Sequence, residues 1–172
     1  MLTLDVGCGE RWTGDVNCDF DLANRFNHRR NSKALNLKDI PNFVVCDSQH
    51  LPFKSECFDK VISQHTIEHV PDPDLMFHEL LRVSKKHVLI RCPHRLGDCF
   101  EPHPNHIQKF AQGWFNLKAK TYRLSIDIRT SRYKFLPHEY FPLLQVPVEM
   151  TIDLHKNFKK TTKDRHKRCS FN

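Results

Sequence analysis

A glycine turn flanked by acids opens the chain, in an order typical of nucleotide-binding domains. In LDVGCGERWTGDVNCDFD, residues 4–21, Gly7 and Gly9 follow one apolar run and Asp19 ends the next. Glycine lets a backbone approach a ligand closely, and an acid at the end of a second strand can accept both hydroxyls of a ribose. The G-x-G spacing alone is a weak signal, because the third glycine of the dinucleotide fingerprint is missing. This stretch therefore indicates the binding of a nucleotide-like cofactor.

Polar and titratable side chains also follow the next two apolar runs. Asp47 and Ser48 follow NFVVC, where a carboxylate could accept a hydrogen bond from an adenine amine. His65 and His69 follow FDKVIS. Histidine titrates near neutral pH, so each is a candidate general base for an acceptor that must lose a proton. A purely structural role is the alternative for both histidines.

Short apolar runs alternate with segments of helical spacing along the chain. Strands are expected at residues 3–7, 15–20, 42–47, 58–63, 87–93, 121–128 and 146–154, and helices at residues 73–85 and 106–120. The second helix would carry Phe110, Trp114 and Leu117 on one side. Residues 21–41 are polar and basic, and their poor periodicity leaves a helix there open. Such alternation implies an α/β fold with a mostly parallel sheet, which binds ligands beyond the carboxyl ends of its strands.

Three segments carry a family resemblance and are, in order, LDVGCG, GDVNCDFD and VVCDSQHLPFKSECFDKVISQHTIEHVPDPDLMFHELLRVSK. Over residues 3–93, the chain resembles a class I S-adenosylmethionine-dependent methyltransferase of the type 11 kind. The resemblance implies a three-layer Rossmann-like sandwich. Its seven-stranded, mostly parallel sheet has the order 3-2-1-4-5-7-6, with the seventh strand antiparallel. It also implies the cofactor S-adenosylmethionine (SAM) and methyl transfer to an acceptor that the sequence does not name. The residues assigned in this way are Asp5 at the methionine amino group, Gly7, Cys8 and Gly9 along the methionine and ribose, Asp19 at the ribose diol, Asp47 and Ser48 at the adenine edge, and Gln64 and His65 near the sulfonium.

The sequence departs from the family pattern in two places. Only residues 10–14 separate Gly9 from Asp15, so we expect at most one helical turn there, with Trp12 filling the space of the missing helix. The first strand begins almost at Met1, whereas many relatives carry N-terminal helices over the cofactor. We therefore expect an exposed cofactor site that a partner chain, a second copy or the substrate covers. A non-catalytic partner subunit with the same fold is the alternative.

A metal site is a further hypothesis. HTIEH, residues 65–69, resembles the E-x-x-E-H segment of small-RNA 3′-terminal 2′-O-methyltransferases and ubiquinone-pathway O-methyltransferases. In those relatives the two acids and the histidine bind a divalent ion, joined in the RNA enzymes by a later histidine. Here His65 replaces the first acid, and His106 would be the later histidine. A second set has a spacing that matches no standard zinc motif: Cys92, His94, Cys99, His103 and His106. Whether a metal binds stays open.

Composition indicates one folded domain with a basic tail. The chain has 172 residues and a net charge of +7, of which residues 155–172 carry five Lys and two Arg against one Asp. We expect a methyltransferase domain at residues 1–154. The tail either binds RNA, as in an RNA methyltransferase, or another anionic surface, or it is a solvated or disordered terminus. Deleting the tail would weaken RNA binding in the first case. Seven cysteines without a C-x-x-C pair, no membrane-spanning run and no signal-peptide pattern together predict a cytoplasmic protein with reduced thiols.

Overall fold

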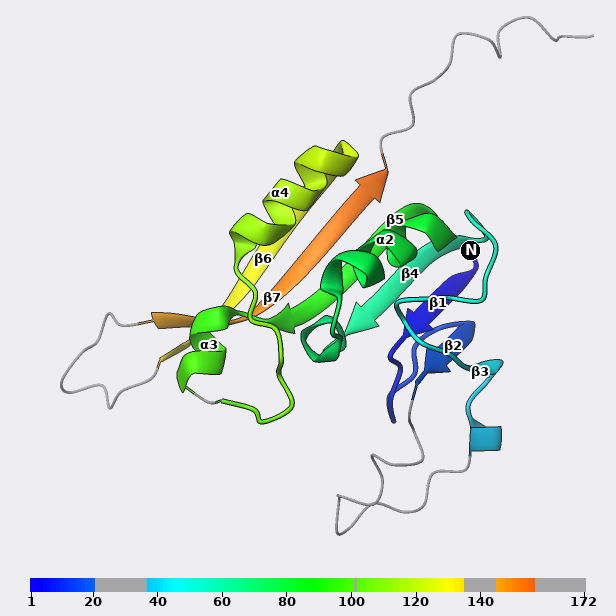
Figure 1. Cartoon of the computed structure of the whole chain (residues 1–172), viewed down its shortest axis with the longest axis horizontal. Helices are drawn as coiled ribbons and strands as arrows, with labels where there is room; N and C mark the ends of the chain where they lie inside the picture. The colour runs from blue at the N-terminus through cyan, green and yellow to red at the C-terminus, as the bar shows by residue number, and fades with distance from the viewer. Residues whose placement is uncertain (21–36, 101, 135–144, 157–172) are drawn as a thin grey trace, which may run out of the picture.

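Seven strands form one sheet in the order β3-β2-β1-β4-β5-β7-β6 (Figure 1). The computed structural model describes residues 1–20, 37–100, 102–134 and 145–156. The strands are β1 Thr3–Val6, β2 Val16–Asp19, β3 Phe43–Val45, β4 Phe58–Gln64, β5 Ser84–Pro93, β6 Leu124–Lys134 and β7 Gln145–Lys156. Strand β7 runs antiparallel to β5 and β6, and the pairs among β1 to β5 are parallel. The predicted strand order and the predicted antiparallel strand are confirmed.

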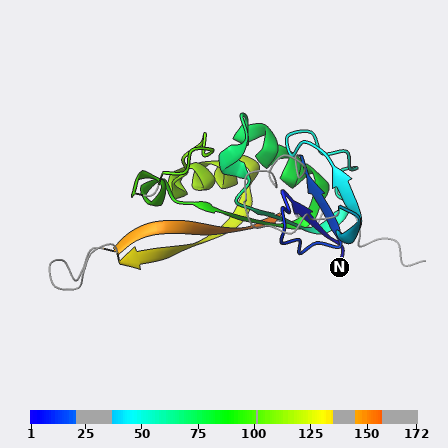
Figure 2. The same cartoon turned by 90° about the horizontal axis from the view of Figure 1, so that it is seen from below.

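The described helices pack on one face of this sheet, as Figure 2 shows. They are α2 Pro73–Val83, α3 Arg95–Phe100 and α4 Gln112–Tyr122. Two single turns, η2 at Leu37–Asp39 and η3 at Ile67–His69, lie in connections between elements. The rings of Phe77 in α2 and Trp114 in α4 meet edge to face, with centroids 5.5 Å apart. Lys118 Nζ lies 2.6 Å from Asp74 Oδ1. The two long helices therefore lie side by side.

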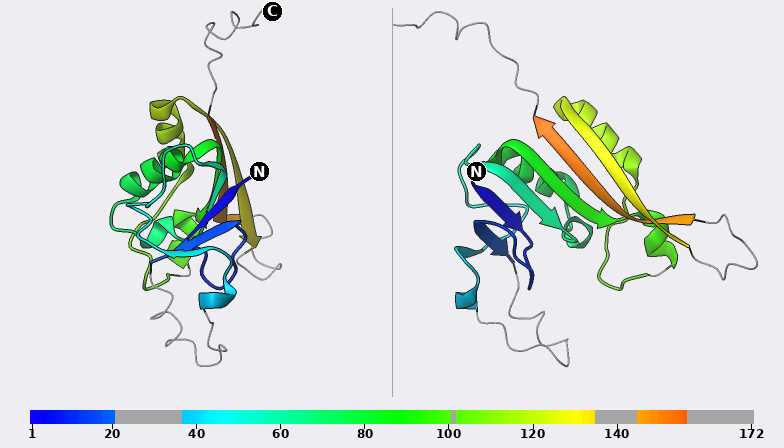
Figure 3. Two further views of the ribbon diagram at one scale, coloured as in Figure 1. Left: turned by 90° about the vertical axis from the view of Figure 1, so that its right-hand side faces the viewer. Right: turned by 180° about the vertical axis from the view of Figure 1, so that it is seen from behind.

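Residues along β5 and β7 alternate between the core and the opposite face. Val88, Ile90 and Ile152 are buried in the core beneath the helices. His87 and Asp153 occupy intervening positions, so their side chains point to the other face. Figure 3 shows that face in its right panel, where no helix of the described residues covers the strands.

Helix α2 begins where the sequence predicts it. Pro73 takes the first helical position. The Asp72 carboxylate accepts hydrogen bonds from the backbone N–H groups of Asp74 and Leu75, each at 3.0 Å. The helix ends two residues earlier than predicted, because β5 follows it without a loop.

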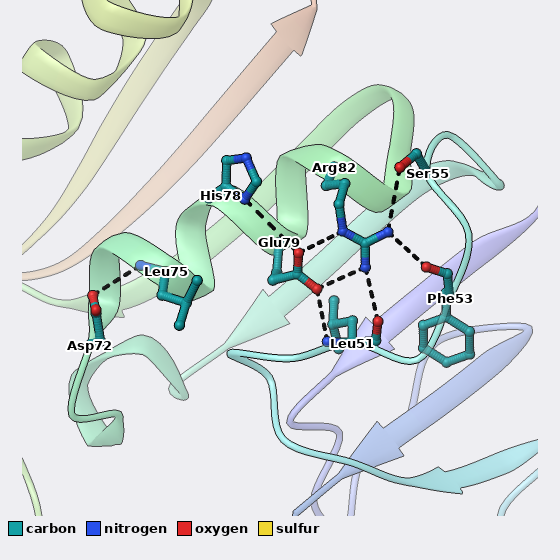
Figure 4. A network of polar contacts seen from close by, with 8 residues as sticks. All are labelled: Leu51, Phe53, Ser55, Asp72, Leu75, His78, Glu79 and Arg82. Carbon is teal, nitrogen blue, oxygen red and sulfur yellow. Dashed lines mark hydrogen bonds and ion pairs between the residues drawn. The ribbon is translucent and has the colours of Figure 1, made fainter.

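A polar network ties the loop between β3 and β4 to helix α2 (Figure 4). Arg82 Nη2 donates to Glu79 Oε2 at 2.7 Å and to the Leu51 carbonyl at 2.9 Å. Its Nη1 donates to the Phe53 carbonyl at 2.7 Å. The Leu51 N–H donates to Glu79 Oε2 at 2.8 Å. The Arg82 guanidinium holds the pKa of the Glu79 carboxyl below its ordinary value. Side-chain bonds thus fix a loop that carries no helix of its own.

Helix α4 begins later than the sequence predicts. The helix expected at residues 106–120 starts at Gln112, and no helix precedes it between residues 102 and 111. The N–H groups of Ile107 and Gln108 donate to the Glu68 carbonyl at 3.0 and 3.1 Å. These bonds hold the segment against η3, and α4 begins only after it.

The buried side of α4 is formed by other residues than the three predicted to share one side of the helix. Phe115 and Ala119, four residues apart, are buried, whereas Leu117 is 61% exposed. Phe110 is buried, but it precedes the helix and forms an isolated bridge with His94. Because Leu117 lies two residues from both buried positions, it falls on the opposite side of the helix. Of the three side chains predicted on one side of the helix, Phe110 therefore lies outside α4 and Leu117 is exposed.

The connection between β1 and β2 holds no helix, as predicted, because residues 7–15 form turns and bends only. Asp5 Oδ2 accepts hydrogen bonds from the backbone N–H and the hydroxyl of Thr13, each at 2.8 Å. Trp12 is partly buried and lies outside the core cluster of the described residues. That Trp12 fills the space of the missing helix stays a prediction. The helix left open after β2 falls mainly on residues 21–36, outside the described residues.

None of the described helices is long and apolar enough to cross a membrane. The six cysteines in the part of the chain that the structure describes are free thiols, in agreement with the reduced state predicted from their spacing.

Candidate functional site

The carboxyl ends of β1, β2 and β3 meet at one edge of the sheet. The loop after β1 is held to the end of β2, because Gly7 N–H donates to the Cys18 carbonyl at 2.8 Å and Gly9 N–H donates to Asp19 Oδ2 at 3.0 Å. The Asp19 carbonyl in turn accepts the Cys46 N–H at 3.1 Å. The Asp19 side chain is only 3% exposed. A buried carboxylate therefore lies directly beneath the glycine loop.

Both loop glycines adopt left-handed backbone, at φ +73° for Gly7 and +52° for Gly9. A Cβ on Gly7 would lie 2.1 Å from Thr66 Oγ1, so the loop there packs directly on the end of β4. A Cβ on Gly9 would meet no atom within 4 Å. The backbone at Gly9 thus borders open space beside Asp19, which is what a ribose-bearing ligand requires.

The two glycines should respond differently to alanine. Gly7→Ala is expected to destabilise the fold by about 2–4 kcal/mol, through the left-handed backbone and the collision with Thr66. Gly9→Ala is expected to destabilise the fold by only about 1–2 kcal/mol, because alanine disfavours the left-handed backbone. It should instead weaken SAM binding, because its Cβ enters the open space. Thermal unfolding and calorimetric titration of both variants test this. Equal stability loss in the two variants would contradict the geometry.

The other residues assigned to the cofactor lie at the same edge. Burial raises the pKa of the Asp5 carboxyl, and the hydrogen bonds from Thr13 partly offset the rise. Asp47 follows β3 and accepts the Gln49 N–H through Oδ1 at 2.8 Å, and Ser48 beside it is buried. These positions agree with the predicted roles, which stay predictions.

The thiol of Cys8 lies in an environment that keeps it protonated. Burial raises its pKa to about 12, and the carboxylates of Asp19 and Asp5 add to the effect. The nucleophilic form of cysteine is the thiolate. Cys8 is therefore an inert lining residue at this edge and does not compete for an electrophile.

His65 takes a left-handed backbone at φ +50° directly after Gln64, the last residue of β4. Its Nε2 lies 2.9 Å from Glu149 Oε1, and its Nδ1 lies 3.5 Å from Glu68 Oε1. The Glu68 carboxylate raises the pKa of the His65 imidazole, with Glu149 adding to the rise and burial opposing it. This environment favours the imidazolium, which donates protons and is poorly suited to act as a general base.

Glu68 is fully buried in η3, and among the described residues neither of its carboxylate oxygens has a hydrogen-bond partner. The contact with His65 at 3.5 Å is an ion pair, too long for a good hydrogen bond. Burying a carboxylate costs several kcal/mol unless it is paired or coordinates a metal. A buried carboxylate of this kind calls for a partner beyond His65, which a water molecule or a cation can supply.

Two histidines border Glu68 with their tautomers set by other groups. His69 Nδ1 lies 2.8 Å from the Asn105 carbonyl, and His106 Nδ1 lies 2.6 Å from Oδ1 of the buried Asp98. Both partners accept hydrogen bonds, so Nδ1 carries the proton and Nε2 the lone pair in each ring. One ligand atom from each of Glu68, His69 and His106 lies within 4.8 Å of the others.

A carboxylate with two imidazoles, each ring oriented by a second partner, is a donor set that fits a divalent transition metal. The wider cysteine–histidine set is not brought together. Cys92 is buried in the core, Cys99 is exposed, and neither joins a ligand cluster of the described residues. His103 stacks on the His106 ring at 4.6 Å instead.

Sequence reasoning missed three partners at this edge: Thr13, Asp98 and Glu149. Asp98 lies eight residues before His106, in a stretch rich in histidines. The presence of an acid there was the one signal in the sequence that a histidine could have a carboxylate partner. Glu149 reaches His65 from β7 through tertiary packing, which no local pattern reveals.

Comparisons with known proteins agree with this geometry. The family model described as methyltransferase domain matches residues 4–92, just over half of the chain. Methyltransferase GfsG from Streptomyces halstedii is 29% identical over 92 residues, which is 48% of this chain and 33% of that protein. The match therefore spans about a third of that curated relative.

Three solved structures share the fold. A SAM-dependent methyltransferase from Thermotoga maritima aligns with a TM-score of 0.63 at 18% identity, covering 91% of this chain and 82% of its own. The YcgJ protein from Bacillus subtilis aligns with a TM-score of 0.60 at 13% identity, covering 91% of this chain and 92% of its own. A Haloferax volcanii methyltransferase, solved with the Trm112 activator, aligns with a TM-score of 0.58 at 12% identity. The alignment covers 89% of this chain and 81% of its own. With the matched family model, the strand order and the acids at the strand ends, this chain belongs to the class I SAM-dependent methyltransferases.

Proposed function

We propose that the chain transfers the methyl group of SAM to a hydroxyl oxygen. Bound SAM supplies a methyl group on a positively charged sulfur. A lone pair of the acceptor can attack the methyl carbon, and the sulfur then leaves. Asp19 is the residue that holds the ribose, and Asp47 with Ser48 holds the adenine edge. Their location at the ends of β2 and β3 supports this assignment. Asp5 keeps the glycine loop in place through Thr13.

The acceptor class rests on one observation, the buried carboxylate of Glu68, which has no hydrogen-bond partner among the described residues. In the proposal, Glu68, His69 and His106 hold a divalent cation beside the end of β4. A divalent cation lowers the pKa of a hydroxyl that binds it, so the acceptor could lose its proton at neutral pH. His69 acts as a ligand in this arrangement. His65 lies between Glu68 and Glu149 and orients Glu68.

Replacing Glu68 with glutamine separates this proposal from a cofactor site alone. The glutamine keeps the size of the side chain but removes an anionic ligand, so we expect turnover to fall by at least about 100-fold. The affinity for S-adenosylhomocysteine should stay within about twofold, because Glu68 lies outside the residues assigned to the cofactor. The assay measures release of S-adenosylhomocysteine with a catechol and with a short RNA bearing a free 3′-terminal diol, each with added Mn²⁺ or Co²⁺.

Glu56→Gln, which changes an exposed carboxylate, is the matched control and should keep wild-type turnover. Turnover that survives both a chelator and the Glu68→Gln change would exclude the metal and the acceptor class derived from it. Methyl transfer itself would then still stand, because SAM binding is measured separately.

A further inference from the structure

A second histidine–carboxylate cluster lies on the opposite face of the sheet from the helices. His87 in β5 and His155 in β7 are directly paired across the two antiparallel strands. Asp153 precedes His155 by two residues, so its side chain points to the same face. The neighbouring Val88, Ile152 and Leu154 point into the core. The face that carries this cluster is the one in the right panel of Figure 3.

Both imidazoles of this cluster converge on one oxygen. His87 Nε2 contacts Asp153 Oδ1, and His155 Nε2 lies 3.1 Å from the same atom. The two rings stack in parallel, with centroids 4.6 Å apart and planes inclined by 4°. Two ring nitrogens and one carboxylate oxygen therefore surround a single small volume, and one ligand atom from each residue lies within 4.8 Å of the others.

A cation can replace the shared protons if the close contact between His87 and Asp153 opens slightly, while His155 already has a suitable spacing. Around a tetrahedral ion with bonds of about 2.0–2.1 Å, two ligand atoms lie roughly 3.3 Å apart. The separation of His155 Nε2 from Asp153 Oδ1 is close to that value. Two imidazoles with one carboxylate, and a fourth position facing solvent, form a donor set that Zn²⁺ uses in proteins.

The surroundings of the cluster fix its geometry. All three ligands project from paired strands of the sheet, which hold side chains more precisely than loops do. Arg129 Nη2 lies 3.9 Å from Asp153 Oδ2, so the second carboxylate oxygen faces a cation while Oδ1 faces the histidines. Asp127 in β6 pairs directly across from Asp153 and supplies a second negative charge nearby.

We propose that His87, Asp153 and His155 bind a divalent transition metal of the zinc type, independently of the methyl-transfer site. The ion would join β5 to β7 through side chains as well as backbone bonds. It would therefore stabilise the folded chain, because a ligand that binds only the native state raises its stability by mass action.

Zinc titration of the full chain tests this proposal, with a chromophoric chelator as competitor and thermal unfolding in parallel. We expect wild-type protein to show a saturable zinc site. Zinc at 100 times its Kd should raise the Tm by about 5–10 °C. His155→Ala should weaken that site at least tenfold and abolish its share of the Tm rise. The His155 side chain is 56% exposed, so the variant should fold.

Two further variants make the result specific. His50→Ala removes a histidine that is 73% exposed elsewhere and should leave zinc binding unchanged. Glu68→Gln should keep the proposed site, because Glu68 belongs to the cluster on the other side of the sheet. Co²⁺ absorption should report a site that Asp153→Asn weakens and Glu68→Gln retains. Equal zinc affinity and equal Tm rise in wild type and His155→Ala would overturn the proposal.

Discussion

Replacing Asp19 with asparagine is expected to weaken SAM binding by about 100-fold while the fold is kept. The Asp19 side chain is buried beneath the glycine loop and accepts the Gly9 N–H at 3.0 Å. Asparagine can still accept that bond through its amide oxygen, so the loop should stay in place. It loses the negative charge and one acceptor for the ribose hydroxyls. Hydrogen bonds to a charged group contribute about 1.5–3 kcal/mol each, which corresponds to the expected loss.

The matched control for this change is Asp127→Asn, which alters a carboxylate that is 67% exposed on β6. We expect wild-type affinity for SAM in that variant. Calorimetric titration gives the two affinities, and circular dichroism shows whether each variant is folded. A folded Asp19→Asn variant that binds SAM as tightly as wild type would remove Asp19 from the cofactor site.

Replacing Arg82 with methionine is expected to destabilise the fold by about 2–3 kcal/mol. Methionine keeps the apolar stem but removes the bonds to Glu79 and to the Leu51 and Phe53 carbonyls. Losing one partner of a buried ion pair costs about 3–5 kcal/mol, and partial exposure of Arg82 reduces that figure. Urea unfolding measures the difference. A loss below about 0.5 kcal/mol would show that the network in Figure 4 does not hold the loop between β3 and β4.

The ion pair between Glu79 and Arg82 also predicts that the stability of the fold depends on pH. The pKa of Glu79 is lowered in the folded protein, so the stability it contributes is present above its unfolded pKa of about 4.3. That stability is lost as the pH falls through the lower folded value. The Arg82→Met variant should therefore lose less stability than wild type between about pH 5 and pH 3. Parallel acid-destabilisation curves for the two proteins would contradict this assignment.

Local patterns in the sequence predicted the strands and several of the polar residues that lie at their carboxyl ends. Gly7, Gly9 and Asp19 end apolar runs, and parallel strands place such ends at one edge, so their proximity followed from the order of elements. The strand order itself came from the family resemblance. The start of α4 was predicted too early, because the bonds that tie residues 107 and 108 to Glu68 join segments far apart in the sequence.

Contacts that depend on strand register could not be predicted. His87 and Asp153 meet only because β5 and β7 pair in one particular alignment, and a shift of one strand by one residue would move its side chain to the opposite face. Asp98 reached His106 through the packing of α3, which has no periodic signal. The basic tail beyond residue 156 lies outside the described residues, so its role toward RNA stays a prediction. The same holds for a partner chain that covers the cofactor site.

Calorimetric titration of the wild-type chain with S-adenosylhomocysteine tests the central claim most directly. We expect one site per chain with a micromolar Kd, because the glycine loop and the acids at the ends of β2 and β3 are already in place. Saturable binding with that stoichiometry would support the proposed cofactor residues and justify a search among hydroxyl acceptors. No saturable heat at millimolar ligand would contradict the account.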